Sequence, residues 1–437
     1  MHNMTEKKEK FGLFSIILLG INSIIGTGIF LLPNRAYALM GTASLGILLF
    51  DACLAGALAL CFAEAAGFFS RNGGPYLYAK AAFGDFWGYE IGVLKLVVTI
   101  IAWAAMAVGF ATALGAAFPA LAGDGAKDVI SALLIGGLSA LNIAGVKTTK
   151  YLNNILTVSK LVPLVLFIAL GIFFLNGSNF IPLVPAHLEK GAFANAAITM
   201  FFAFTGFEAI AVGAEDFKDP KRNLPRGIIL TMVLVTVIYM LVVAISIGIL
   251  GPDLAADKAP IQTAFGRILG PVGSYIILVG TLFSMGGINM AESFIAPRAC
   301  TSLSEDGMLP EILAKRTPWG TPYVASIVIA VLSIALAWSG SFTTLAAISA
   351  VSRFTQYLPT CLAVIVFRKK WADRPRTYKI PGGITIPVIA LITSLWMLSN
   401  AKTMQLIWGL GGCLVILPYY FVYANKKKQG LIKEKEE

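Results

Sequence analysis

Gly26-Thr27-Gly28-Ile29-Phe30 interrupts the first long apolar segment of the chain, residues 11–33. A glycine in a helix interior costs about 1 kcal/mol relative to alanine. In hydrocarbon, an opened helical turn also leaves amide and carbonyl groups without water, and each such group costs several kcal/mol. A break of this kind therefore persists only where something polar satisfies the freed backbone.

A second break, Phe204-Thr205-Gly206-Phe207-Glu208, interrupts a later apolar segment over residues 193–213. Gly26 and Gly206 are 180 residues apart, as expected if the broken segments are the first and sixth spans of two five-helix units. Because five is odd, the units would have opposite orientations in the membrane. Paired interrupted segments are the best sequence indication of a substrate site in a secondary transporter.

The composition supports a membrane protein, because 57% of the residues are hydrophobic and 13% are charged. Many apolar stretches approach the ~20 residues that cross a ~30 Å hydrocarbon layer. The sequence predicts twelve spans, over residues 11–33, 42–69, 87–117, 128–146, 153–175, 193–213, 226–250, 271–297, 323–338, 341–367, 380–399 and 404–423.

The predicted fold is therefore an all-α integral membrane protein with twelve transmembrane helices and broken helices 1 and 6. No soluble domain is expected, since the longest polar stretches are short loops. The expected organisation is an N-terminal tail (1–10), two five-helix repeats (11–175 and 193–367), helices 11 and 12 (380–423) and a C-terminal tail (424–437).

The net charge of +11 is an orientation signal and does not indicate nucleic acid. With these spans, 25 of the 34 Lys and Arg residues lie on the side of the termini and six lie on the other. The positive-inside rule then places both termini in the cytoplasm. Two histidines and five scattered cysteines give no metal site, and no cofactor is expected. No HExxH motif or nucleophile elbow indicates an enzyme.

The first break offers groups that suit an α-amino acid. Amides at the start of a half-helix, in Gly26-Thr27-Gly28, suit a carboxylate. Carbonyls at the end of the preceding half, near Ile24 and Ile25, suit an ammonium group, and the second break adds more. The alternative is that these glycines are small residues for close helix packing. The candidate substrate-binding residues are Ile24, Ile25, Gly26, Thr27, Gly28, Phe201, Phe202, Ala203, Phe204 and Gly206.

Lys160 lies about seven residues, or ~11 Å, inside the fifth predicted span. A lysine buried at this depth could gain and lose a proton during a transport cycle. The alternative is that its side chain reaches the headgroups. Position alone does not decide between the two.

Other ionisable residues also fall within predicted spans. Arg353 could be a fixed counter-charge for Glu208 or Glu292, or could serve only in a structural pair. Glu208 could titrate, contact a cationic substrate, or cap a half-helix. Lys95 has a possible partner in nearby Glu90.

These residues belong to a series of motifs that covers nearly the whole chain and resembles the amino acid–polyamine–organocation (APC) superfamily. The motifs are Gly26-Thr27-Gly28-Ile29-Phe30, Phe62-Ala63-Glu64, Arg71-Asn72-Gly73-Gly74-Pro75-Tyr76, Ala82-Phe83-Gly84, Gly145-Val146-Lys147, Thr157-Val158-Ser159-Lys160-Leu161, Phe204-Thr205-Gly206-Phe207-Glu208, Asp219-Pro220, Leu224-Pro225-Arg226 and Asp306-Gly307-Met308-Leu309-Pro310.

The resemblance implies a LeuT-like inverted-repeat fold that works by alternating access. It implies that the first break holds the substrate carboxylate, although Thr27 stands where serine is commoner. It implies that an aromatic residue at Phe202 closes the site, where several relatives carry Trp. It also implies that Lys160 occupies the region of a sodium ion, as in sodium-independent members.

The expected function is sodium-independent, proton-coupled amino-acid transport across the plasma membrane, with a small or medium neutral substrate weakly preferred. The expected partners are the amino acid, the proton and the lipid bilayer. Alternatives are an obligate amino-acid exchanger, an amino acid/amine antiporter and, outside transport, a non-transporting sensor.

Overall fold

The computed structural model describes residues 12–69, 74–145, 150–208, 210, 217–374 and 378–429. Within these ranges the chain is helical and contains no strand. The predicted tail 1–10, the end of the C-terminal tail and the motif segments Arg71-Asn72-Gly73 and Val146-Lys147 lie outside the described residues.

The helices follow the predicted apolar segments. In chain order they are α1 (Leu13–Ile24), α2 (Thr27–Leu31), α3 (Pro33–Met40), α4 (Ser44–Ala66), α5 (Pro75–Phe83), α6 (Asp85–Ala117), α7 (Asp124–Ile143), α8 (Lys150–Gly171), α9 (Ala192–Phe204), α11 (Pro220–Leu250), α12 (Pro260–Leu269), α13 (Pro271–Glu305), α14 (Tyr323–Trp338), α15 (Phe342–Lys370), α16 (Thr385–Ser399), α17 (Thr403–Leu410) and α18 (Gly412–Lys428).

Six helical stretches in the described part of the chain are long and apolar enough to cross a membrane, and α16 with α17 forms a seventh candidate, bent by 118°. The apolar helices α1 and α9 are shorter, because each ends at a break. The structure thus supports a multi-pass helical membrane protein, and twelve spans remain a prediction.

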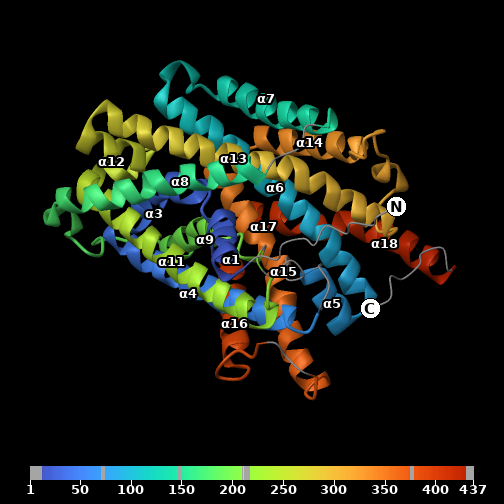
Figure 1. The fold of residues 1–437 in the computed structure, drawn as a ribbon. Coiled ribbons are helices and arrows are strands. Elements are labelled where there is room, and N and C mark those ends of the chain that lie inside the picture. Colours follow the sequence, from blue (N-terminus) through green and yellow to red (C-terminus); the bar gives the residue numbers. More distant parts are fainter. Residues whose placement is uncertain are drawn as a thin grey trace.

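The long helix α6 runs through the middle of the bundle and packs most extensively against α13 and α15. α4 packs mainly against α11 and α9, and α11 also packs along α1. Figure 1 shows α7 beside α14 at one edge of the molecule and α16 at another. The two broken segments therefore lie inside a shell of long helices.

Two helices form between the predicted spans. Residues 260–269 form α12, and residues 75–83 form α5. Both begin with proline at the first helical position, where its missing N–H is not needed. Gly84 and Gly270 follow them with φ of +94° and +62° and turn the chain directly into α6 and α13. The stretch between the predicted spans 226–250 and 271–297 is therefore largely helical.

A buried ion pair joins α4 to α15. The Glu64 side chain is fully buried and accepts hydrogen bonds from Arg368 Nε (2.7 Å), Arg368 Nη2 (2.5 Å) and the Ile380 amide (2.8 Å). Arg368 is 9% exposed. Removing one partner of such a pair leaves an uncompensated buried charge, which costs about 3–5 kcal/mol.

Glu64→Gln should therefore destabilise the protein by several kcal/mol and clearly lower its melting temperature in detergent, measured by intrinsic fluorescence. The matched control is Glu305→Gln, which breaks the half-exposed Arg316–Glu305 pair and should cost at most about 1 kcal/mol. Equal, small shifts in both variants would contradict this account of the pair.

Candidate substrate-binding site

The first break separates α1 from α2 within one apolar segment. Helix α1 ends at Ile24, Ile25 and Gly26 adopt extended backbone conformations, and α2 begins at Thr27. Residues 24–33 are all buried. The open helix end therefore lies in the protein interior, where its carbonyls need internal donors.

The second break lies against the first. Helix α9 ends at Phe204, and Gly206 has a φ of +110°. A Cβ at Gly206 would collide with the Ser23 carbonyl oxygen, and one at Gly28 would lie 2.7 Å from the Ala203 Cα. Both glycines thus allow close approach of the two backbones, as the packing alternative requires. This role does not exclude ligand binding, which uses backbone groups.

Lys160 reaches the first break from α8. Its Nζ donates hydrogen bonds to the carbonyl oxygens of Asn22 (2.6 Å) and Ile25 (3.0 Å). The residue is 1% exposed, so the amine points into the protein and does not reach the headgroups. The ammonium group thus satisfies carbonyls that the end of α1 leaves without helical partners.

Tyr239, on α11, is a site residue that the sequence reasoning missed. Its buried hydroxyl lies 3.0 Å from the Ala203 carbonyl oxygen and 3.3 Å from the Ile24 carbonyl oxygen. With a single hydroxyl hydrogen, Tyr239 can donate to only one of them at a time. It nevertheless links the ends of α1 and α9. A tyrosine in the middle of an apolar span was the available signal, since its hydroxyl needs a partner.

Other expected ligand groups also have internal partners. The Phe202 carbonyl accepts from the Thr205 hydroxyl (2.7 Å) and amide (3.2 Å). The Thr27 hydroxyl donates to Met106 Sδ (2.7 Å). A carbonyl oxygen has two lone pairs, so an internal donor leaves room for a second one. The Phe202 carbonyl is thus fully satisfied, whereas the carbonyls of Ile24, Ile25 and Ala203 each have one side-chain donor and can still accept another.

A cavity of about 500 Å³ lies at one end of the bundle. Its lining includes Leu31 of α2, Val108 and Thr112 of α6, and Phe342 at the start of α15. The Phe342 ring packs edge-on against Phe202, with centroids 6.0 Å apart. Phe342 therefore lines the cavity and also contacts Phe202, a buried residue (2% exposed) near the end of α9.

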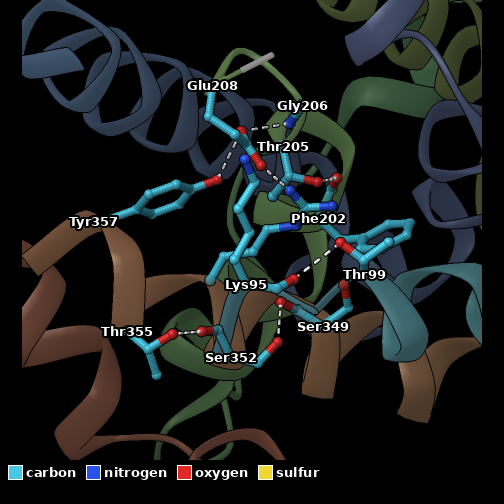
Figure 2. Close-up of polar contacts among 11 residues, drawn as sticks. Lys95, Thr99, Phe202, Thr205, Gly206, Glu208, Ser349, Ser352, Thr355 and Tyr357 are labelled. Atoms are coloured by element: carbon cyan, nitrogen blue, oxygen red, sulfur yellow. Dashed lines mark hydrogen bonds and ion pairs between the residues drawn. The ribbon is translucent and has the colours of Figure 1, made fainter. Parts of the chain in front are cut away.

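A polar cluster lies beyond the second break. Glu208 forms an ion pair with Arg353 of α15, and its Oε2 accepts from the Tyr357 hydroxyl (3.1 Å) and the Gly206 amide (3.0 Å). Figure 2 shows this carboxylate between Tyr357 and Gly206. Glu208 thus both pairs with Arg353 and caps the freed backbone. Tyr357 was not anticipated from the sequence.

Within the described residues no ion pair joins Lys95 to Glu90. The carboxylate near enough to act on the Lys95 ammonium group is Glu292 of α13. Figure 2 shows Lys95 beside the cluster of Glu208 and Tyr357. Residues five positions apart on one helix point to different faces, which explains the wrong partner. Arg353, in turn, contacts Glu208 and not Glu292.

Comparisons with known proteins agree over nearly the whole chain. Residues 11–417 match the family model described as amino acid permease. An uncharacterized transporter of Mycobacterium tuberculosis is 34% identical, covering 88% of this chain and 86% of the relative. The branched-chain amino acid permease BcaP of Bacillus subtilis is 30% identical, covering 96% and 94%.

A methylthioribose transporter of Bacillus subtilis is also similar, at 28% identity, covering 94% of this chain and 93% of the relative. These relatives are named as permeases and transporters, not as enzymes. The chain therefore belongs to the amino acid permease family, within the APC superfamily of membrane transporters.

Proposed function

We propose that this protein is a secondary transporter of neutral amino acids, sodium-independent and proton-coupled, that works by alternating access. The observation that carries the proposal is the pair of adjoining helix breaks held by Lys160 and Tyr239. A cation fixed on the carbonyls of the first break takes a place that a metal ion would otherwise fill. The amine could respond to protons, whereas sodium would have no role there.

The substrate carboxylate would bind the amides of Gly26, Thr27 and Gly28. The ammonium group would use the remaining lone pairs of carbonyls in the 24–25 and 201–204 segments. Gly28 and Gly206 support this arrangement by bringing the two breaks together. Binding through charged termini alone would accept many amino acids, so the side-chain pocket would set specificity.

A neutral substrate is supported by the state of Glu208. Its carboxylate already has Arg353, Tyr357 and the Gly206 amide as partners, which leaves little capacity for a cationic side chain. The name of the relative BcaP makes branched-chain amino acids the first substrates to test.

Access to the site would alternate between two barriers. On one side, the Phe202–Phe342 pair, whose Phe342 ring lines the cavity, would form the barrier. On the other, the Glu208–Arg353–Tyr357 cluster would close the path. The two five-helix repeats, residues 11–175 and 193–367, would rock against each other, in a plasma membrane with both termini cytoplasmic.

If both charged ends of the substrate are bound, analogues that lack one should fail to compete. Leucinamide lacks the carboxylate and N-acetylleucine lacks the ammonium group. The concentration of each analogue that halves the uptake of radiolabelled leucine into proteoliposomes should be at least tenfold higher than that of unlabelled leucine. Leucinamide competing as well as leucine would rule out a carboxylate site at the first break.

Lys160→Met keeps the length of the side chain but removes its charge and its hydrogen bonds to Asn22 and Ile25. Leucine uptake driven by a pH gradient should fall at least tenfold. Replacing sodium with choline should leave wild-type uptake unchanged. The exposed Lys315→Met serves as the control. Unchanged pH-driven uptake in Lys160→Met, or a sodium requirement in the wild type, would contradict the proposed coupling.

Phe202→Ala should weaken leucine binding about tenfold or more, because it removes the ring that packs against Phe342 above the break. The adjacent Phe201 stacks on Phe354 in the core, with centroids 5.3 Å apart. Phe201→Ala should therefore lower the melting temperature with a much smaller effect on affinity. Ligand-induced thermal shifts measure both quantities, and wild-type affinity in Phe202→Ala would show that this ring does not cover the substrate.

A further inference from the structure

Asp51 is a buried carboxyl group to which none of the roles described above applies. It lies in α4, seven residues or ~11 Å from the start of the helix at Ser44. Its exposed fraction is 0%, and neither carboxylate oxygen has a hydrogen-bond partner. By contrast, the buried carboxylates of Glu64 and Glu208 each have an arginine and a backbone amide as partners.

No neighbouring charge compensates Asp51 within the described residues. Helices α9 and α16, which pack against α4, carry no ionisable side chain. On α11, Tyr239 bonds to backbone carbonyls, while Arg222 and Arg226 are exposed.

The other helices that pack extensively against α4 are α15, α3 and α5. On α15, Arg353 and Tyr357 contact Glu208, Arg368 contacts Glu64, and Lys369 and Lys370 are exposed at the end of the helix. The ionisable groups of α3 and α5 are Arg35, which is exposed, Tyr37, Tyr76, Tyr78 and Lys80. The ionisable groups of α5 come after the C-terminal end of α4, which is the end that carries Glu64.

The free-energy cost of an ionised carboxylate in such surroundings would be very high. Burial removes its hydration, and no hydrogen bond or opposite charge compensates for that loss. The neutral acid costs far less, although its hydroxyl remains unsatisfied. In this conformation the group is therefore stable only with a proton bound. Ionisation requires another conformation, in which water or a polar partner reaches the carboxyl.

We propose that Asp51 is a proton-binding site that is protonated in this conformation and releases its proton in another conformation of the transport cycle. This inference rests on the proposed function and adds a second titratable site to it. Asp51 is separate from Lys160, because α8 is not among the helices that pack extensively against α4.

Helix packing connects Asp51 to the candidate substrate site. Its helix packs along α11, which carries Tyr239, and along α9, which ends at the second break. A negative charge on Asp51 would favour conformations in which water enters between α4 and the helices α11 and α9. A proton can drive a conformational change only through such a difference in affinity between states.

Asp51→Asn tests the proposal, because asparagine has nearly the shape of aspartic acid and stays neutral. In proteoliposomes, leucine counterflow at equal pH should remain near the wild-type rate, since exchange needs no net proton movement. Leucine accumulation driven by a pH gradient should fall at least tenfold. The exposed Asp373→Asn should change neither. Wild-type accumulation in Asp51→Asn, or loss of counterflow by a folded variant, would overturn the proposal.

Infrared difference spectroscopy on the wild-type protein provides a readout that does not require transport. At neutral pH we expect the C=O band of a protonated carboxylic acid, absent in Asp51→Asn or, if that variant is unstable, in Asp51→Leu. Leucine should change its intensity. A missing band, or one insensitive to leucine, would overturn the proposal. Failure of wild-type counterflow would instead reject the proposed transport function.

Discussion

The open end of α1 depends on the Lys160 ammonium group, which donates to the carbonyls of Asn22 and Ile25. An interrupted helix in an apolar interior needs such donors, because no water is present to replace the lost helical bonds. The Tyr239 hydroxyl lies within reach of the Ile24 carbonyl and of the Ala203 carbonyl in the second broken helix, and can donate to one of them at a time. Together these two side chains make a pair of breaks tolerable at the centre of a membrane protein.

The same carbonyls are those that would bind a substrate ammonium group, so internal donors and substrate would share a limited set of acceptors. A change in the charge of Lys160 would then alter both the break and the site. The Glu208–Arg353 pair has a comparable position at the second break. At each break, charged side chains thus lie next to backbone groups that have lost their helical hydrogen-bond partners. This arrangement links protonation, backbone geometry and substrate in our proposal.

Much of the fold could be predicted from the sequence, because apolar segments and glycine-containing breaks are local signals. The ends of α1 and α9 fall at the two predicted interruptions. Partners that depend on tertiary packing could not be predicted: the hydroxyls of Tyr239 and Tyr357 each join segments that are far apart in the sequence. Helix α12 was missed because its amphipathic sequence lacks the apolar run that identifies a span. Asp51 has no local motif, and its significance follows from complete burial without a partner.

Hydrogen–deuterium exchange of the break amides tests the central claim most directly. Leucine should slow exchange in peptides that cover residues 24–31 and 203–208, whereas leucinamide at the same concentration should not. Protection of both segments by leucine alone would place the substrate carboxylate and ammonium group at the breaks. Leucine binding that leaves exchange in both segments unchanged would contradict the account.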